Sequence, residues 1–240
     1  GGFGPRRIPS DSLGILTSAD SALIIDERTW TVLFEKAPTD VRPIASLTKL
    51  MTALVMLDEG MDMTADVTIM RSDYRVGGIV NVFSGEVLSK QDLWMIGLIP
   101  SDNVAMAALV RSTGLSVEEF AEKMNAKAVS LGMTSSSFIE PTGIDSRNVS
   151  TARDLAKLIQ EAMKHVEITD AVRRPTYSFE PKNKNGIRRV VSTNVLLKSF
   201  VNEQPYEVLG GKTGFTNEAG YCLSVMVDGP NAADNVIVIL

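Results

Sequence analysis

The sequence contains one cysteine and one histidine among its 240 residues, and this scarcity excludes several kinds of chemistry. Cys222 has no partner for an internal disulfide, and no Cys and His cluster has the spacing of a zinc site. A Ser-His-Asp triad would need His165, which ends a charged amphipathic segment without a visible partner, so we expect a surface residue. Cys222 lies in a strand pattern, where cysteine is more often a small buried residue than a nucleophile.

The chain also lacks an excess of positive charge and any long apolar run. Its 24 basic and 29 acidic residues give a net charge of −5, which argues against binding nucleic-acid phosphates. The apolar runs are shorter than the roughly 18 to 20 residues that span a bilayer. The first residues do not form a signal peptide, so we expect a cytoplasmic protein or a mature form without its signal.

What the sequence does contain is a pattern of strands at both ends and helices between them. Runs 21–27 and 30–36 indicate an antiparallel hairpin, and runs 176–179 and 188–192 indicate another. Apolar residues at helical spacing and capping signals predict helices at 44–60, 90–98, 103–112, 117–131 and 152–164. The last strands are predicted at 211–216, 221–227 and 236–240.

This order of elements predicts an α+β fold with an antiparallel β-sheet flanked by helices. We expect one domain over residues 1–240, with a sheet part at about 1–60 and 190–240. A mostly helical inserted part is expected at about 61–189. The second hairpin carries four cations that we expect to be solvated: Lys182, Lys184, Arg188 and Arg189.

Three short elements carry the candidate chemistry. They are Ser46-Leu47-Thr48-Lys49 at a helix start, Ser101-Asp102-Asn103 in a turn, and Lys212-Thr213-Gly214 on a late strand. Each is weak alone, because Ser46 could simply cap a helix. Together and in this order they resemble the signature of penicillin-binding proteins and class A β-lactamases.

Spacing explains how the first element can work. Residues three apart lie on one face of a helix, so the Lys49 amine can reach the Ser46 hydroxyl. A serine hydroxyl needs a base to become a good nucleophile, and lysine can be that base when burial and nearby cations lower its pKa. The apolar helix and the second cation, Lys212, can supply these effects, so we expect Lys49 to be the base.

The second element can act on a substrate from the opposite wall of a cleft. Ser101 can relay a proton between Lys49 and a leaving amine, and the Asn103 amide can donate to a peptide carbonyl. Asp102 is also suited to cap the helix that follows.

The third element lies on a strand along which a substrate can pair by β-addition. Lys212 and Thr213 can hold a carboxylate there, while Gly214 keeps the cleft free of a side chain. The preceding Gly210 and Gly211 can allow close approach of a substrate backbone. A phosphate-binding loop is excluded, because the first glycine of its pattern is missing.

Longer strings around these elements make the sequence similar to the serine D-alanyl-D-alanine carboxypeptidases, which are low-molecular-mass penicillin-binding proteins. The strings are 44–53, 101–103, 131–134, 141–145, 150–155 and 211–221. The resemblance implies a β-lactamase/transpeptidase-like fold and an exported enzyme on the periplasmic or extracytoplasmic side. Such enzymes remove the terminal D-alanine from peptidoglycan stem pentapeptides, and no cofactor or metal is expected.

The resemblance also implies a role for each matching residue. Ser46 would form an acyl-enzyme that water hydrolyses, Lys49 would be the base, and Ser101 would relay the proton. The implied oxyanion hole consists of the backbone N–H groups of Ser46 and Phe215. Penicillins mimic the substrate end and are expected to acylate Ser46. The implied substrate-binding residues are Asn103, Lys212, Thr213, Gly214 and Phe215.

Three other functions remain open at this point. A DD-endopeptidase that cuts peptide cross-links would use the same residues. A class A β-lactamase needs a glutamate that activates water, for which Glu140 is the only candidate, and its usual Glu-x-x-Leu-Asn setting is absent. A catalytically silent module that binds cell-wall peptides would not be acylated by a β-lactam.

Family members usually continue beyond the last predicted strand into a helix that packs on the sheet. Some carry a further domain and a C-terminal amphipathic helix for peripheral membrane attachment. Because this chain ends at Leu240, we expect a truncated form without that segment.

Overall fold

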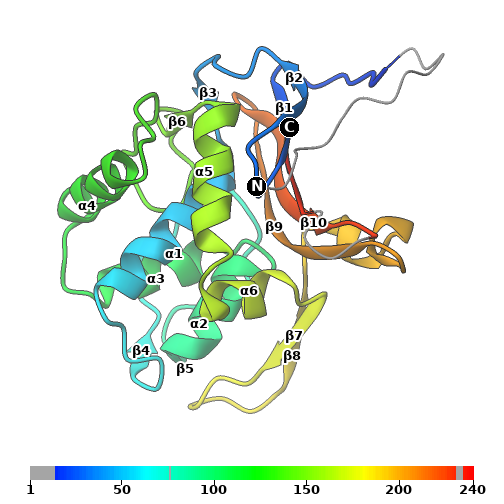
Figure 1. The fold of residues 1–240 in the computed structure, drawn as a ribbon. Helices are drawn as coiled ribbons and strands as arrows, with labels where there is room; N and C mark the ends of the chain where they lie inside the picture. The colour runs from blue at the N-terminus through cyan, green and yellow to red at the C-terminus, as the bar shows by residue number, and fades with distance from the viewer. Residues whose placement is uncertain (1–13, 76, 231–234) are drawn as a thin grey trace.

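The computed structural model describes residues 14–75, 77–230 and 235–240, so the N-terminal residues compared with a signal peptide lie outside the described part. Its main feature is a five-stranded antiparallel sheet in the order β2-β1-β11-β10-β9 (Figure 1). The strands are β1 Ala22–Asp26, β2 Val32–Lys36, β9 Glu207–Thr216, β10 Gly220–Asp228 and β11 Val236–Ile239. The first strand pairs with the last at Leu23 and Ile239, which confirms the predicted sheet built from both ends of the chain.

Helices cover one face of this sheet. They are α1 Thr48–Asp58, α2 Lys90–Leu98, α3 Asn103–Arg111, α4 Val117–Ser130, α5 Ala152–Ala162 and α6 Val166–Val172. Helix α5 packs against β1, β10 and β11 on one side and against α1 on the other. In the described part of the chain, no helix combines the length and apolar character needed to cross a bilayer.

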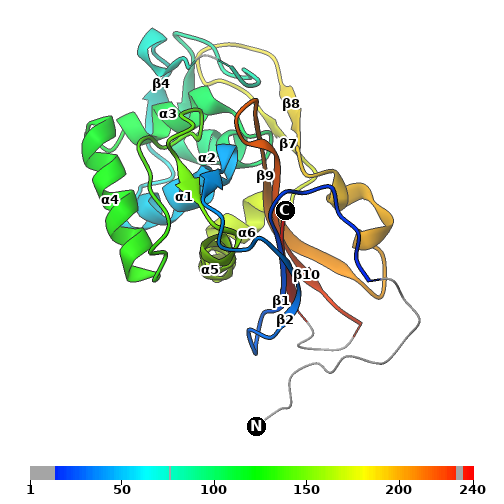
Figure 2. The same ribbon diagram turned by 90° about the horizontal axis from the view of Figure 1, so that it is seen from above.

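The opposite face of the sheet carries a smaller apolar cluster. Two short 3-10 helices, η3 Val195–Lys198 and η4 Phe200–Asn202, lie there, and Figure 2 shows this orange segment across the sheet from the helices. Leu197 packs with Val208, Val225 and Val227 from β9 and β10. Both faces of the C-terminal strands therefore contribute to apolar packing.

Helix α1 begins the helical part and lies at its centre. Its residues from Thr48 to Met56 are all buried, which agrees with the apolar pattern of the sequence. A short 3-10 turn, η1 Ala45–Leu47, precedes it and packs against β9. This packing brings the first motif next to the third, although more than 160 residues separate them along the chain.

Two helix starts carry the predicted capping residues. Both hydrogen bonds of the capping box form at α4, whereas only one of them forms at α5. Ser116 and Glu119 form a reciprocal capping box at α4. At α5, Thr151 accepts from the Asp154 N–H, but the Asp154 carboxylate accepts from Ser135 and Ser136 instead of completing the box. That carboxylate ties the start of α5 to the preceding loop.

Three two-stranded ribbons complete the part of the chain that the structure describes. They pair β3 Arg42–Pro43 with β6 Val149–Ser150, β4 Asp66–Thr68 with β5 Val87–Ser89, and β7 Thr176–Phe179 with β8 Arg188–Val191. The last pair is the second predicted hairpin. Three of its four cations, Lys182, Lys184 and Arg189, are exposed as expected, and Lys184 lies 3.8 Å from the buried carboxylate of Glu86. Arg188 is partly buried and lies 2.7 Å from that carboxylate. Lys182 pairs with Asp66. The hairpin is thus fixed to the segment before α2 by opposite charges.

Candidate active site

Ser46 lies in a tight turn immediately before α1. The preceding residue, Ala45, has a φ of 45°, which is costly for a residue with a side chain. The Leu47 N–H donates to the Ile44 carbonyl at 3.1 Å, and the Ile44 N–H donates to the Asn148 carbonyl at 3.1 Å. The turn therefore holds a strained backbone that presents the Ser46 hydroxyl at the start of a buried helix.

The Lys49 amine is the point where three parts of the chain meet. It lies completely buried and donates to Ser46 Oγ at 2.8 Å, Asn103 Oδ1 at 2.6 Å and the Thr142 carbonyl at 2.8 Å. The predicted contact between Ser46 and Lys49 is therefore present. Thr142 was not among the predicted site residues, and only its place in the family-like string 141–145 pointed to it.

These partners decide how a neutral Lys49 would be oriented. A neutral amine has two N–H groups and one lone pair. Asn103 Oδ1 and the Thr142 carbonyl can only accept, so they would take both N–H groups. The remaining lone pair then faces the Ser46 hydroxyl, which is the one partner that can donate. The arrangement can move a proton from Ser46 to Lys49.

Burial makes the neutral form of Lys49 accessible near neutral pH. Loss of hydration lowers the pKa of Lys49 to about 7, although the carboxylates of Glu140 and Asp102 oppose this shift. Burial and the charge of Lys49 lower the pKa of Lys212 well below its usual range. Burial is the largest cause for both lysines, and the expected contribution of Lys212 to the lowered pKa of Lys49 does not accompany it.

The second motif supplies Asn103 to Lys49 and leaves Ser101 free. The Asn103 amide nitrogen donates to the Gly77 carbonyl at 3.3 Å, so both ends of this amide are used within the protein. Asp102 caps α3 through the Ala105 N–H, as predicted. Ser101 has a φ of 65°, and its Oγ is buried without a partner in the described part of the chain.

The third motif lies on β9, which is an edge strand of the sheet. Lys212 is 1% exposed and donates to the Thr213 carbonyl at 2.9 Å, while the Thr213 hydroxyl bonds to that of Thr193 at 2.6 Å. Phe215 is 55% exposed and stacks on Tyr221 with 4.6 Å between ring centroids. The edge position leaves one side of the strand without a neighbouring strand, as pairing with a peptide requires.

Two glycines from distant segments pack directly on the Ser46 turn. A Cβ at Gly143 would lie 2.0 Å from the Ala45 carbonyl oxygen, and one at Gly214 would lie 2.9 Å from the Ser46 nitrogen. Gly210 serves a different purpose from the one expected. A Cβ there would lie 2.7 Å from a methyl of Val172, so its missing side chain makes room for α6 and not for a substrate.

Glu140 is placed differently from a residue that activates water. Its carboxylate accepts hydrogen bonds from within the following loop, residues 140–145, and from Asn148. The donors are the N–H groups of Thr142, Gly143, Ile144 and Asp145, the Thr142 hydroxyl and the Asn148 amide, at 2.5 to 3.4 Å. With both oxygens already used, this carboxylate is poorly suited to hold a catalytic water.

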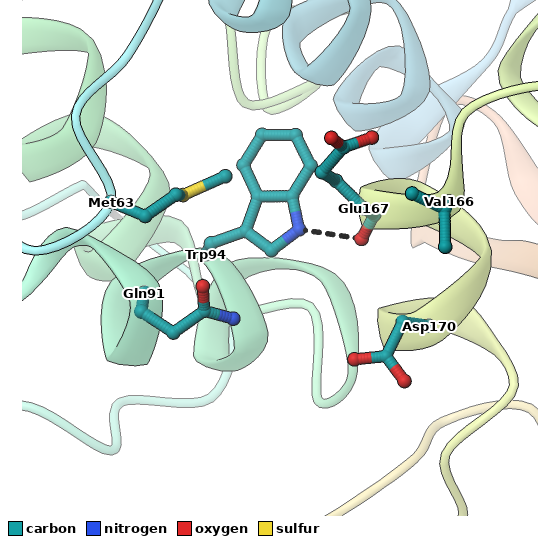
Figure 3. Close-up of a pocket in the computed structure, with 6 residues that line it drawn as sticks. All are labelled: Met63, Gln91, Trp94, Val166, Glu167 and Asp170. Carbon is teal, nitrogen blue, oxygen red and sulfur yellow. Dashed lines mark hydrogen bonds between the residues drawn. The ribbon is translucent and has the colours of Figure 1, made fainter.

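Two other features do not contribute to this site. Burial raises the pKa of the Cys222 thiol to about 11, which makes it a poor nucleophile. A pocket of about 230 Å³ lies between α2 and α6 and is lined by apolar and acidic side chains and by the amide of Gln91 (Figure 3). Its Trp94 donates to the Glu167 carbonyl and its Asp170 pairs with Arg174, so these polar groups have partners within the fold.

Comparison with known proteins gives a consistent result. The chain matches the peptidase S11 family, D-alanyl-D-alanine carboxypeptidase, over residues 11–240. It is 36% identical to a D-alanyl-D-alanine endopeptidase from Escherichia coli, covering 92% of this chain and 72% of that protein. It is 34% identical to a D-alanyl-D-alanine carboxypeptidase from Bacillus subtilis, over 86% of this chain and 53% of that protein. The crystal structure of the Streptomyces K15 DD-transpeptidase superimposes with a TM-score of 0.85 at 29% identity. The superposition covers 95% of this chain and 91% of the transpeptidase.

Proposed function

Because the chain belongs to the peptidase S11 family of D-alanyl-D-alanine carboxypeptidases, we propose that it cleaves D-Ala-D-Ala stem peptides with Ser46 as nucleophile and Lys49 as base. It is a serine hydrolase with the fold of the penicillin-binding peptidases. The observation that supports these two roles best is the Lys49 amine, which lies 2.8 Å from Ser46 Oγ and has its other two partners fixed as acceptors.

In the proposed reaction, Ser46 Oγ attacks the carbonyl carbon of the penultimate D-alanine while Lys49 takes its proton. The oxyanion that forms is stabilised by the N–H groups of Ser46 and Phe215. The C–N bond then breaks as Ser101 gives its proton to the leaving amine of the terminal D-alanine and receives from Lys49 the proton taken from Ser46. Water hydrolyses the resulting ester and frees Ser46. The unpartnered Ser101 hydroxyl is available for that relay.

The remaining motif residues are proposed to hold the substrate. Lys212 and Thr213 would bind the terminal carboxylate, which would restore the proton on Lys212 by placing an opposite charge beside it. Gly214 would allow the peptide to lie along β9, next to Asn103. The same features would accept a β-lactam, which makes the enzyme a target of these antibiotics.

A second candidate is a DD-endopeptidase that cuts the peptide cross-links of the cell wall. The relative from Escherichia coli with that name is 36% identical, and this chain covers more of it than of the Bacillus subtilis carboxypeptidase. Both activities would form the same acyl-enzyme and differ in the leaving group. A carboxypeptidase releases the terminal D-alanine, whereas an endopeptidase releases the other peptide of the cross-link. Either would act in the cell envelope, so we propose that the protein is exported.

Product analysis separates the two candidates. The purified protein would be incubated with a stem pentapeptide and, separately, with a cross-linked peptide dimer, and the products identified by mass. Free D-alanine from the pentapeptide supports the carboxypeptidase, whereas monomers from the dimer with an intact pentapeptide support the endopeptidase. Ser46→Ala should abolish either product, and a folded parent protein that cleaves neither substrate would contradict the proposal.

A further inference from the structure

The 140–145 loop is built around one carboxylate. Four successive backbone N–H groups point toward the Glu140 side chain, from Thr142 to Asp145, at distances between 2.5 and 3.4 Å. Such a set of hydrogen bonds to one carboxylate fixes the path of the backbone. Asn148 also donates to both the carboxylate and the backbone carbonyl of Glu140. An uncharged or shorter side chain could not satisfy all of these donors in the same geometry.

The loop that Glu140 shapes contacts the reacting groups at several points. Its Thr142 carbonyl accepts from Lys49 at 2.8 Å, and its Gly143 leaves no space for a side chain against Ala45. Its Pro141 carbonyl accepts from the Thr52 hydroxyl on α1 at 2.7 Å. The position of the loop thus determines one of the two acceptors that orient Lys49.

We propose that Glu140 is a positioning residue for acylation, and that its carboxylate holds the Thr142 carbonyl against Lys49 and Gly143 against the Ser46 turn. This inference rests on the proposed function, because it concerns the base of that reaction. Glu140 does not touch substrate in this scheme and acts through the loop and through its charge.

The charge of Glu140 gives the proposal a distinctive consequence. The ionisable groups that face Lys49 are Glu140, Asp102 and the second lysine, Lys212. The two carboxylates favour protonated Lys49, against the larger effect of burial. Loss of the Glu140 charge should therefore lower the pKa of Lys49 further. A residue that only maintained the fold would not change this value in that direction.

The test measures the rate of acylation by benzylpenicillin from acid to alkaline pH, using intact mass, for the parent and for Glu140→Gln. We expect the maximal rate to fall about tenfold or more, because the Thr142 carbonyl is displaced. We also expect the acid side of the profile to move down by roughly half a pH unit or more. A profile that stays at the parent position, or a rate equal to that of the parent, would overturn the proposal.

Two further variants keep the result interpretable. Asp145→Asn removes a charge from the same loop at a carboxylate that pairs with Arg147, and it should leave rate and profile as in the parent. Glu140→Asp keeps the charge but shortens the side chain, so the rate should fall without a shift of the profile. If Glu140→Gln does not fold, parent-like acylation by Glu140→Asp would overturn the proposal. A folded parent that takes no penicillin would overturn the proposed function itself.

Discussion

Two lysine side chains lie almost completely out of water in this molecule, with exposed fractions of 0% for Lys49 and 1% for Lys212. Burial of an ammonium group is costly, and proteins accommodate it by lowering the pKa until the amine is neutral. For Lys49, this cost accounts for the neutral base that we propose beside Ser46. For Lys212, we propose that the charge returns when a substrate carboxylate binds beside it.

The pKa of Lys49 predicts the pH dependence of acylation. Only the neutral amine can accept the Ser46 proton, so the rate should rise with pH and level off above about 7. Below that value it should fall about tenfold for each pH unit. This pH dependence can be checked by measuring the second-order rate constant of acylation by benzylpenicillin. Samples are quenched at set times, and the acylated fraction is read from the intact mass. A rate that does not change on the acid side would show that Lys49 is not the base.

The backbone strain at Ser101 and its unpartnered hydroxyl let us predict how two substitutions change stability. Its hydroxyl is buried without a partner in the described chain, so Ser101→Ala should raise the free energy of unfolding by about 1 kcal/mol, because it removes an unsatisfied polar group. Its φ of 65° suits glycine, so Ser101→Gly should raise that free energy by about 1 kcal/mol. Both should slow turnover of a peptide substrate. Urea unfolding measures the two stabilities, and a large loss in Ser101→Ala would reveal a structural role for the hydroxyl.

At the scale of elements, the turn before α1 depends on contacts from segments far away in sequence. A substitution at Gly143 tests whether the turn depends on these contacts. Gly143→Ala would place a Cβ 2.0 Å from the Ala45 carbonyl, so the turn or the 140–145 loop must move. We expect a loss of about 2 kcal/mol in unfolding free energy and acylation at least about tenfold slower.

Gly132→Ala is a matched control for that change. Gly132 also has a positive φ, of 69°, but a Cβ there would meet nothing within 4 Å. The unfolding free energy of Gly132→Ala should fall only by the cost of a left-handed alanine, about 1 kcal/mol. Its rate of acylation should not change. Equal acylation in the two variants would mean that close packing on Ser46 is unimportant.

The elements that sequence predicted best are those with strong local signals. The start of α4 follows the predicted serine cap, Ser116, and apolar periodicity marked α1. Helix α6 was not predicted, because its seven residues offer little periodicity. Strand β9 begins at Glu207, before the predicted 211, since Gly210 and its neighbour weaken a strand pattern that the sheet pairing overrides.

For the molecule as a whole, packing across the two parts predicts cooperative unfolding. Helix α5 contacts both the sheet and α1, and η1 contacts β9. We therefore propose a single domain, in which the mostly helical part at about 61–189 packs on the sheet. Calorimetry should give one transition whose calorimetric and van't Hoff enthalpies agree. Two resolved transitions would show that the sheet and the helices unfold separately.

The motif side chains of the site were predictable because serine, lysine and asparagine at that spacing have chemical meaning. The Thr142 carbonyl was not, since a backbone group has no side-chain signature and any residue could supply it. Glu140 was noticed for a different role, in water activation. Only the fold shows that its oxygens face its own loop, and that this loop lies on Lys49.

The most direct test of the account is the intact mass of the protein after incubation with benzylpenicillin, followed over time for the parent and for Ser46→Ala. Covalent catalysis by Ser46 predicts that the parent gains the mass of one intact penicillin and that Ser46→Ala gains none. A lasting adduct would identify a penicillin-binding peptidase. A parent that is folded and gains no mass, or an adduct that persists in Ser46→Ala, would contradict the central claim.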